Sequence, residues 1–313
     1  MDELGRIAML ARLLRGSGQG IEVGIGDDAA VLAPPAGKLV WTIDEQVEGV
    51  HFRRDLASWR DVGWRSYMAA ASDVAAMGAT PWCALAALVV PEDVDDAALE
   101  GVAHGQREAA EAAGAPIVGG NLARGPAMSL ATTLLGTCER PVERRGAMPG
   151  DGLWLAGHVG LAAAGLRALE VGQGTDGGLA AAVAAWRAPR ALFAEGRAMA
   201  GKAHAAVDVS DGLARDAGHL GEASHVQLVL DEAALLDDPC LLEAAAALGA
   251  NALDLALHGG EDYALVAASP SALEGFRRIG EVRSGRGLVL RSLTGERPLE
   301  PQGFDHFARQ SRP

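Results

Sequence analysis

Short apolar runs that favour strands alternate with longer stretches of helical periodicity along most of the chain. The run Ala84–Val90, for example, precedes the alanine- and glutamate-rich stretch Asp95–Gly114, where charged and apolar residues take opposite sides. The alternation continues as far as a strand expected over Tyr263–Ala267. Because this pattern is typical of α/β and α+β folds, we expect sheets covered by helices.

The chain has 313 residues, which is enough for two domains of ordinary size. The segment Arg140–Asp151 contains two prolines and two glycines and is the best candidate for a domain boundary. We therefore expect an N-terminal domain over residues 1–139 and a C-terminal domain over residues 140–313.

The charge balance excludes several classes of protein. With 27 basic and 41 acidic residues the net charge is −14, which argues against a nucleic-acid partner. Neither lysine, Lys38 nor Lys202, stands in a Gly-Lys-Ser/Thr context, so the sequence contains no P-loop.

Three features indicate where the protein resides. Its three cysteines follow no metal or redox spacing, and such usage is typical of a reducing compartment. The first residues are acidic and do not resemble a signal peptide. The apolar run Cys83–Val90 is too short to cross a bilayer. We expect a cytoplasmic protein without a membrane partner.

Acidic residues gather where expected strands end in glycine-containing turns. These residues are Asp27, Asp28, Asp44, Asp208, Asp211, Glu261 and Asp262. Aspartate and glycine are good turn formers, so any one of these sites has an ordinary structural explanation. Their repetition at four similar places favours a shared function.

Asp73 is a sharper case, because it lies in a predicted helix, within an almost entirely apolar stretch over residues 68–77. A buried carboxylate is costly unless it is paired or binds a metal, and no Lys or Arg lies one helical turn away. The candidate ligands are all oxygen atoms, which favours Mg²⁺ held together with the phosphates of a nucleotide.

Two further turns offer weaker signals for phosphate binding. Gly119-Gly120 follows a predicted strand, and Ser210 or Asp211 could cap the helix expected from Gly212. Each has an equally common structural explanation. His51 on its own would be interpreted as a core histidine.

The order of these motifs resembles the thiamine-monophosphate kinase family, within the aminoimidazole-ribonucleotide-synthetase-like superfamily. The similarity extends from Gly24 to Phe307. The motifs in order are Gly-Ile-Gly-Asp-Asp (24–28), Thr-Ile-Asp (42–44) with Val-Glu-Gly-Val-His-Phe (47–52), Ser-Asp-Val-Ala-Ala-Met-Gly-Ala-Thr-Pro (72–81), Gly-Gly-Asn-Leu (119–122), Arg-Arg-Gly-Ala with Pro-Gly-Asp (144–151), Asp-Val-Ser-Asp-Gly-Leu (208–213) and Gly-Gly-Glu-Asp-Tyr (259–263).

The resemblance implies that ATP phosphorylates thiamine monophosphate by direct in-line transfer, with several Mg²⁺ ions. It also implies an N-terminal α/β domain that dimerises through its sheet and a C-terminal α+β domain. The implied metal ligands are Asp27, Asp28, Thr42, Asp44, Asp73, Asn121, Asp208 and Asp211, of which Asp44 and Asp211 are also implied to be catalytic. The implied ATP contacts are Gly120, Asn121, Arg144 and Ser210, and the implied contacts of thiamine monophosphate are His51, Glu261 and Phe304.

Two positions depart from the family pattern. Asn121 stands where the family usually has Asp, and Ile43 replaces a hydroxyl residue between Thr42 and Asp44. Both changes are expected to weaken Mg²⁺ binding. Two alternatives therefore stay open: a related ATP-dependent enzyme that acts on another small phosphorylated substrate, and a non-catalytic nucleotide-binding homologue.

Overall fold

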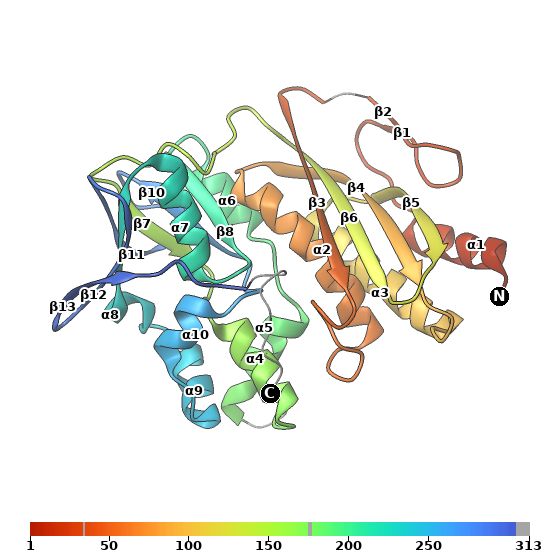
Figure 1. Ribbon diagram of the computed structural model, residues 1–313. Coiled ribbons are helices and arrows are strands. Elements are labelled where there is room, and N and C mark those ends of the chain that lie inside the picture. The colour runs from red at the N-terminus through yellow and green to blue at the C-terminus, as the bar shows by residue number, and fades with distance from the viewer. Residues whose placement is uncertain (34, 175–176, 305–313) are drawn as a thin grey trace. The chain divides into compact units, whose positions relative to one another are not determined.

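The computed structural model describes residues 1–33, 35–174 and 177–304 (Figure 1). The chain divides into two compact units. Unit 1 contains Met1–Pro141 and Arg187–Gly201, and unit 2 contains Val142–Trp186 and the chain from Lys202 onward. The division falls two residues beyond the expected boundary, but Arg187–Gly201 returns to unit 1, which the sequence reasoning missed.

The returning segment belongs to unit 1 because its helix, α6 (Phe193–Met199), packs against α2 (Trp59–Ala76). The Trp64 indole donates a hydrogen bond to the Pro189 carbonyl at 2.6 Å. The Arg187 guanidinium donates to the Leu56 carbonyl at 3.0 Å. The chain thus leaves unit 2 after Trp186, shortly before Pro189.

Unit 1 is built on a four-stranded sheet in the order β3-β6-β4-β5. All neighbours are antiparallel except β4 and β5, which are parallel. Figure 1 shows α2 and α3 together on one face of this sheet. The other elements of unit 1 are α1 (Glu3–Leu14), β1 (Ile21–Val23), β2 (Val31–Leu32), β3 (Lys38–Val47), β4 (Thr80–Val90), α3 (Asp96–Ala113), β5 (Ile117–Arg124) and β6 (Ser129–Cys138).

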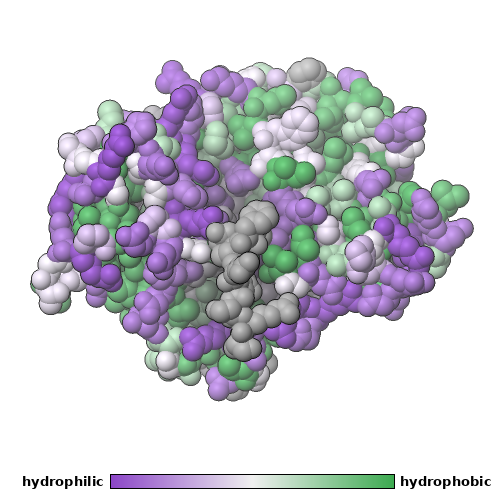
Figure 2. Space-filling model, viewed as in Figure 1, coloured by the Kyte–Doolittle hydropathy of each residue, from purple (hydrophilic) through white to green (hydrophobic). Residues whose placement is uncertain are grey.

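The opposite face of this sheet carries exposed apolar side chains. On β3, Trp41 is 72% exposed and Ile43 is 66% exposed, and Leu39 and Leu85 are exposed as well. Figure 2, drawn in the same view as Figure 1, shows hydrophobic residues in green among polar residues over the unit 1 sheet. Because side chains alternate along a strand, Ile43 lies on the opposite face from Thr42 and Asp44. Within one chain the Ile43 side chain therefore points away from Thr42 and Asp44.

Unit 2 contains a seven-stranded sheet in the order β13-β12-β9-β11-β7-β10-β8. Its core is formed by apolar residues of the inner strands, and every residue of β10 is buried. The strands are β7 (Gly152–Ala156), β8 (Ala205–Val209), β9 (Gln227–Asp231), β10 (Ala264–Ser269), β11 (Arg277–Arg283), β12 (Gly287–Ser292) and β13 (Gly295–Leu299). The helices are α4 (Leu161–Glu170), η1 (Gly177–Leu179), α5 (Ala180–Arg187), α7 (Leu213–Ser224), α8 (Glu232–Leu235), α9 (Pro239–Leu248) and α10 (Ala252–His258).

The prediction of two α/β regions, each with its own sheet, is confirmed. Among the described residues, no single helix is long and apolar enough to span a membrane. The consecutive helices α9 and α10 reach that length and composition only as a pair, with a bend of 115° between them.

Candidate active site

In unit 1 the structure brings three predicted residues together. Thr42 and Asp44 share one face of β3, and the Thr42 hydroxyl donates a hydrogen bond to the Asp73 carboxylate on α2. Asp73 is half-buried rather than buried, so the free-energy cost of desolvating its carboxylate is smaller than for a fully buried group. Asp44 was expected at the end of a strand, but β3 continues past it to Val47.

A row of residues runs across the sheet from Asp44. Asp44 is paired with Thr132 on β6, Thr132 with Ala86 on β4, and Ala86 with Gly120 on β5. Thr132 is fully buried, and its hydroxyl has no hydrogen-bond partner among the described residues. Sequence reasoning missed Thr132, because a threonine inside a strand has an ordinary structural explanation.

Gly120 and Asn121 lie within β5, whereas the sequence suggested a phosphate-binding turn after the strand. A side chain at Gly120 would place its Cβ 1.9 Å from the Ala86 carbonyl oxygen, so close strand packing alone requires glycine. Strands β5 and β3 are the two edges of the sheet, with β6 and β4 between them. At about 4.8 Å per strand, their backbones are about 14 Å apart. One ion therefore cannot bind both Asn121 and Asp44 of the same chain.

The remaining predicted residues of unit 1 lie on loops. Asp27 and Asp28 are exposed, and the Asp27 carboxylate accepts the Asp28 N–H at 2.8 Å. His51 is half-buried, and its Nδ1 accepts the Val47 N–H at 3.0 Å. This contact places any proton of the neutral ring on Nε2. The buried Arg65 donates to the His51 carbonyl at 3.3 Å and thereby fixes the same turn.

In unit 2, Asp208 lies within β8, and Ser210 and Asp211 lie in the turn that follows it. Asp208 is buried, and the other two are half-buried. Neither Ser210 nor Asp211 caps α7, contrary to expectation. Instead the Asp216 carboxylate accepts the N–H groups of Ser210 and Asp211 at 2.9 and 3.0 Å. These amides are therefore already satisfied inside the protein.

Asp216 was missed by the sequence reasoning, since it lies on the first turn of α7 and resembles an ordinary polar helix residue. It is 4% exposed. Burial raises the pKa of Asp216 to about 6, although the two hydrogen bonds from the turn act in the opposite direction.

The Gly-Gly-Glu-Asp-Tyr motif is hydrogen-bonded to the turn after β8. The Glu261 N–H donates to the Ser210 carbonyl at 2.7 Å, and the Tyr263 N–H donates to the Val209 carbonyl at 2.8 Å. The Phe304 N–H donates to the Asp211 carbonyl at 3.0 Å. Three segments that are far apart in sequence, each with predicted site residues, therefore meet in unit 2.

The surroundings of Asp211 are partly cationic. Arg215 Nε lies 3.6 Å from the Asp211 carboxylate, and the exposed Arg144 belongs to the same neighbourhood. Burial, followed by the charges of Arg144 and Arg215, lowers the pKa of His219. Arg215 and His219 line a groove of about 1010 Å³ along α7, which extends to Gly303 beside Phe304.

The predicted metal ligands do not form one compact cluster within a unit. Across the described parts of the chain, no three His, Cys, Asp or Glu side chains are grouped so that they could hold a metal ion. The predicted ligands lie instead on β3 and α2, on β5, on the loop of Asp27 and Asp28, and on β8 and the turn after it. Their oxygen atoms suit Mg²⁺, which usually takes only one or two protein carboxylates and completes its shell with phosphate and water.

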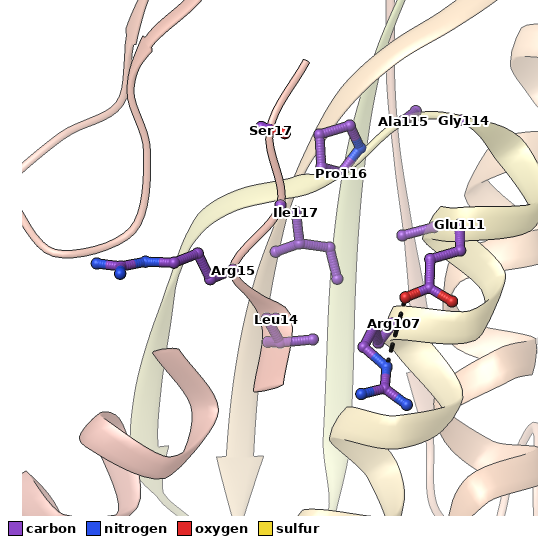
Figure 3. Close-up of a pocket in the computed structure, with 11 residues that line it drawn as sticks. Leu14, Arg15, Ser17, Arg107, Glu111, Gly114, Ala115, Pro116 and Ile117 are labelled. Carbon is purple, nitrogen blue, oxygen red and sulfur yellow. Dashed lines mark ion pairs between the residues drawn. The ribbon is translucent and has the colours of Figure 1, made fainter. Parts of the chain in front are cut away.

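A separate cavity of about 280 Å³ lies in unit 1 and contains none of the predicted site residues (Figure 3). Its apolar lining includes Leu14, Pro116 and Ile117. On α3, Arg107 and Glu111 form an ion pair at 3.6 Å.

Comparisons with known proteins indicate the family of the chain. Residues 26–138 match the family model "AIR synthase related protein, N-terminal domain". The chain is 37% identical over 314 residues to the thiamine-monophosphate kinase of Mycobacterium tuberculosis (strain ATCC 25618 / H37Rv), covering 98% of this chain and 93% of that protein. It is 33% identical over 289 residues to that of Aquifex aeolicus (strain VF5), covering 90% and 92%.

The solved structure "AaThiL complexed with AMPPCP and TMP" resembles this chain with a TM-score of 0.82 and 31% sequence identity, and 97% of each chain is covered. Sequence and structure thus match relatives of one family over nearly their whole length. The chain belongs to the thiamine-monophosphate kinase family.

Proposed function

We propose that this protein transfers the γ-phosphoryl group of ATP directly to thiamine monophosphate, giving ADP and thiamine diphosphate without a phospho-enzyme. The observation that carries the proposal is the hydrogen-bonded meeting of the turn after β8, the Glu261 turn and Phe304. It joins the predicted metal ligand Asp211 to two predicted contacts of thiamine monophosphate. The bound AMPPCP and TMP of the related structure support the same pair of substrates.

The acceptor contacts suit the chemistry of thiamine monophosphate, which has a cationic thiazolium ring and an aminopyrimidine ring. The Glu261 carboxylate can attract the cationic ring or accept a hydrogen bond from the amino group. The Trp186 indole donates a hydrogen bond to this carboxylate at 3.0 Å. Phe304 offers an aromatic face for stacking. His51 is proposed as a further contact.

Mg²⁺ would neutralise charge on the phosphoryl group during its transfer. Thr42, Asp44 and Asp73 form the best-assembled set of oxygen ligands in unit 1. In unit 2 the proposed ligands are Asp208 and Asp211. We propose that further Mg²⁺ ligands come from Asp27, Asp28 and Asn121.

The proposed ATP contacts are Gly120, Asn121, Arg144 and Ser210. The Ser210 N–H is bound to Asp216 and the Ser210 carbonyl accepts the Glu261 N–H. The hydroxyl of Ser210 is therefore the group that we assign to ATP.

A homodimer is also part of the proposal. The apolar face of the unit 1 sheet, with Leu39, Trp41, Ile43 and Leu85, is the surface that we assign to it. Two copies of one face can pair about a twofold axis, which is the commonest symmetry of protein dimers. In this proposal Ile43 packs at the dimer interface, and its apolar side chain does not mark the loss of a metal ligand. A cytoplasmic location stays a prediction.

The test is turnover by the purified protein with Mg²⁺, ATP and thiamine monophosphate. We expect ADP and thiamine diphosphate in equal amounts, and no reaction when EDTA is present. Thiamine and other small phosphorylated acceptors, assayed in parallel, separate this activity from that of a related ATP-dependent enzyme. Tight ATP binding without turnover on any acceptor would favour the non-catalytic homologue, in which Asn121 marks lost activity.

A further inference from the structure

The turn that presents Glu261 has a strained backbone. Glu261 has φ 65° and Tyr263 has φ 51°, so both lie in the left-handed region that side chains other than glycine rarely adopt. In the described part of the chain only His225 shares this feature among non-glycine residues. Such strain persists only where surrounding contacts impose it.

Asp262 stands between these two residues, and its side chain adds an anchor to the backbone hydrogen bonds that join the turn to the segment after β8. Its carboxylate accepts the N–H of Gly160 at 2.5 Å and the N–H of Ala162 at 2.9 Å. Gly160 is the N-cap residue of α4 and Ala162 lies in its first turn, and the helix has no side-chain cap of its own. Asp262 thus satisfies the start of α4 from a distant part of the sequence.

Close backbone packing leaves the turn little freedom to move. Gly160 has φ 80°, and a Cβ there would lie 2.4 Å from the Leu255 carbonyl carbon. A Cβ on Gly260 would lie 2.7 Å from the Ser210 carbonyl oxygen. Gly160 therefore allows the start of α4 to approach α10, and Gly260 allows the Asp262 turn to approach the turn after β8.

We propose that Asp262 is a positioning residue for thiamine monophosphate, because its anchor to α4 holds the strained turn and so fixes the Glu261 carboxylate. This inference rests on the proposed function and adds a residue to which no role has been assigned. Asp262 itself faces α4, and its effect on the substrate passes through Glu261.

The charge state of Asp262 makes this role dependent on pH. Burial raises the pKa of Asp262 to about 7, the charge of Glu261 acts in the same direction, and the two backbone hydrogen bonds and His158 oppose it. The hydrogen bond with Asp238 in turn raises the pKa of His158. Ionised Asp262 accepts both N–H groups, whereas protonation turns one oxygen into a donor. The anchor is therefore strongest above about pH 7.

The experiment compares Asp262→Ala, Asp262→Asn and the control Asp254→Asn, which alters an exposed carboxylate on the nearby helix α10. We expect Asp262→Ala to raise the KM for thiamine monophosphate about tenfold, with less than a twofold change in the KM for ATP. Asp262→Asn keeps one acceptor oxygen and should fall between Asp262→Ala and wild type. The control should match wild type.

A pH profile separates positioning from simple destabilisation. From pH 6 to pH 8, the KM of wild type for thiamine monophosphate should fall relative to that of Asp262→Asn, since only wild type gains a charge there. Equal losses for both substrates that track the melting temperature, with no difference in pH profile, would overturn the proposal. If wild type shows no turnover, the proposed function fails, and calorimetric binding of thiamine monophosphate to the same variants decides the role of Asp262.

Discussion

Trp41 offers a direct test of the proposed dimer. The side chain is 72% exposed on the apolar face of the unit 1 sheet. A tryptophan carries roughly 200 Å² of surface, so about 150 Å² is accessible in one chain. If about two thirds of this area is buried in a dimer, the burial of one Trp41 side chain contributes about 2.5 kcal/mol to the free energy of dimerisation, at 25 cal/mol per Å². A twofold interface contains the residue twice, which gives about 5 kcal/mol for the dimer.

We therefore expect Trp41→Ala to raise the dimer dissociation constant by more than a thousandfold. Sedimentation velocity across a concentration series measures this constant. Leu293→Ala is the matched control, because Leu293 is a fully exposed apolar residue on the β12–β13 hairpin. Unchanged association in Trp41→Ala, or a wild-type protein that is monomeric at micromolar concentration, would refute the reasoning.

Three further predictions concern the site. Asp44→Asn and Asp73→Asn should each abolish turnover while the melting temperature stays within a few degrees, because the amide keeps the shape and removes a metal-binding charge; wild-type kinetics in both would refute the metal assignment. Asn121→Asp should lower the Mg²⁺ concentration for half-maximal rate, and an unchanged requirement would remove this position from the metal site. Phe304→Ala should weaken binding of thiamine monophosphate by on the order of 1–2 kcal/mol, which corresponds to a roughly tenfold rise in its KM. If the KM for ATP rises equally and the melting temperature falls, Phe304 has a core role instead.

Elements with a continuous apolar pattern could be predicted closely from the sequence. The apolar run Ala84–Val90 lies within β4, and β10 begins one residue after the start of the strand expected over Tyr263–Ala267 and ends two residues beyond it. Strand β3 was expected to end near Asp44 but continues to Val47. An edge strand with one exposed face tolerates polar residues, so a polar run there does not mark its end.

The contacts between distant segments could not be predicted. The order of strands in a sheet depends on the whole fold, and this order separates Asn121 from Asp44. Asp216 and Asp262 act on turns and helices that the sequence pattern does not connect to them. The Gly-Gly-Glu-Asp-Tyr motif indicated a site from the sequence alone. Only the structure shows that Asp262 binds the start of α4, whereas Glu261 is the residue assigned to the substrate.

The return of Arg187–Gly201 to unit 1 has a consequence for synthesis on the ribosome. The chain that leaves unit 1 at Pro141 supplies α6 only after about 60 further residues. At 5–20 residues per second, that interval lasts about 3–12 s. During this time the surface of α2 that receives α6 is uncovered, and the Trp64 indole lacks its acceptor on Pro189. The nascent chain therefore passes through a defined period in which a chaperone can bind unit 1, and a fragment that ends at residue 141 would remain in that state.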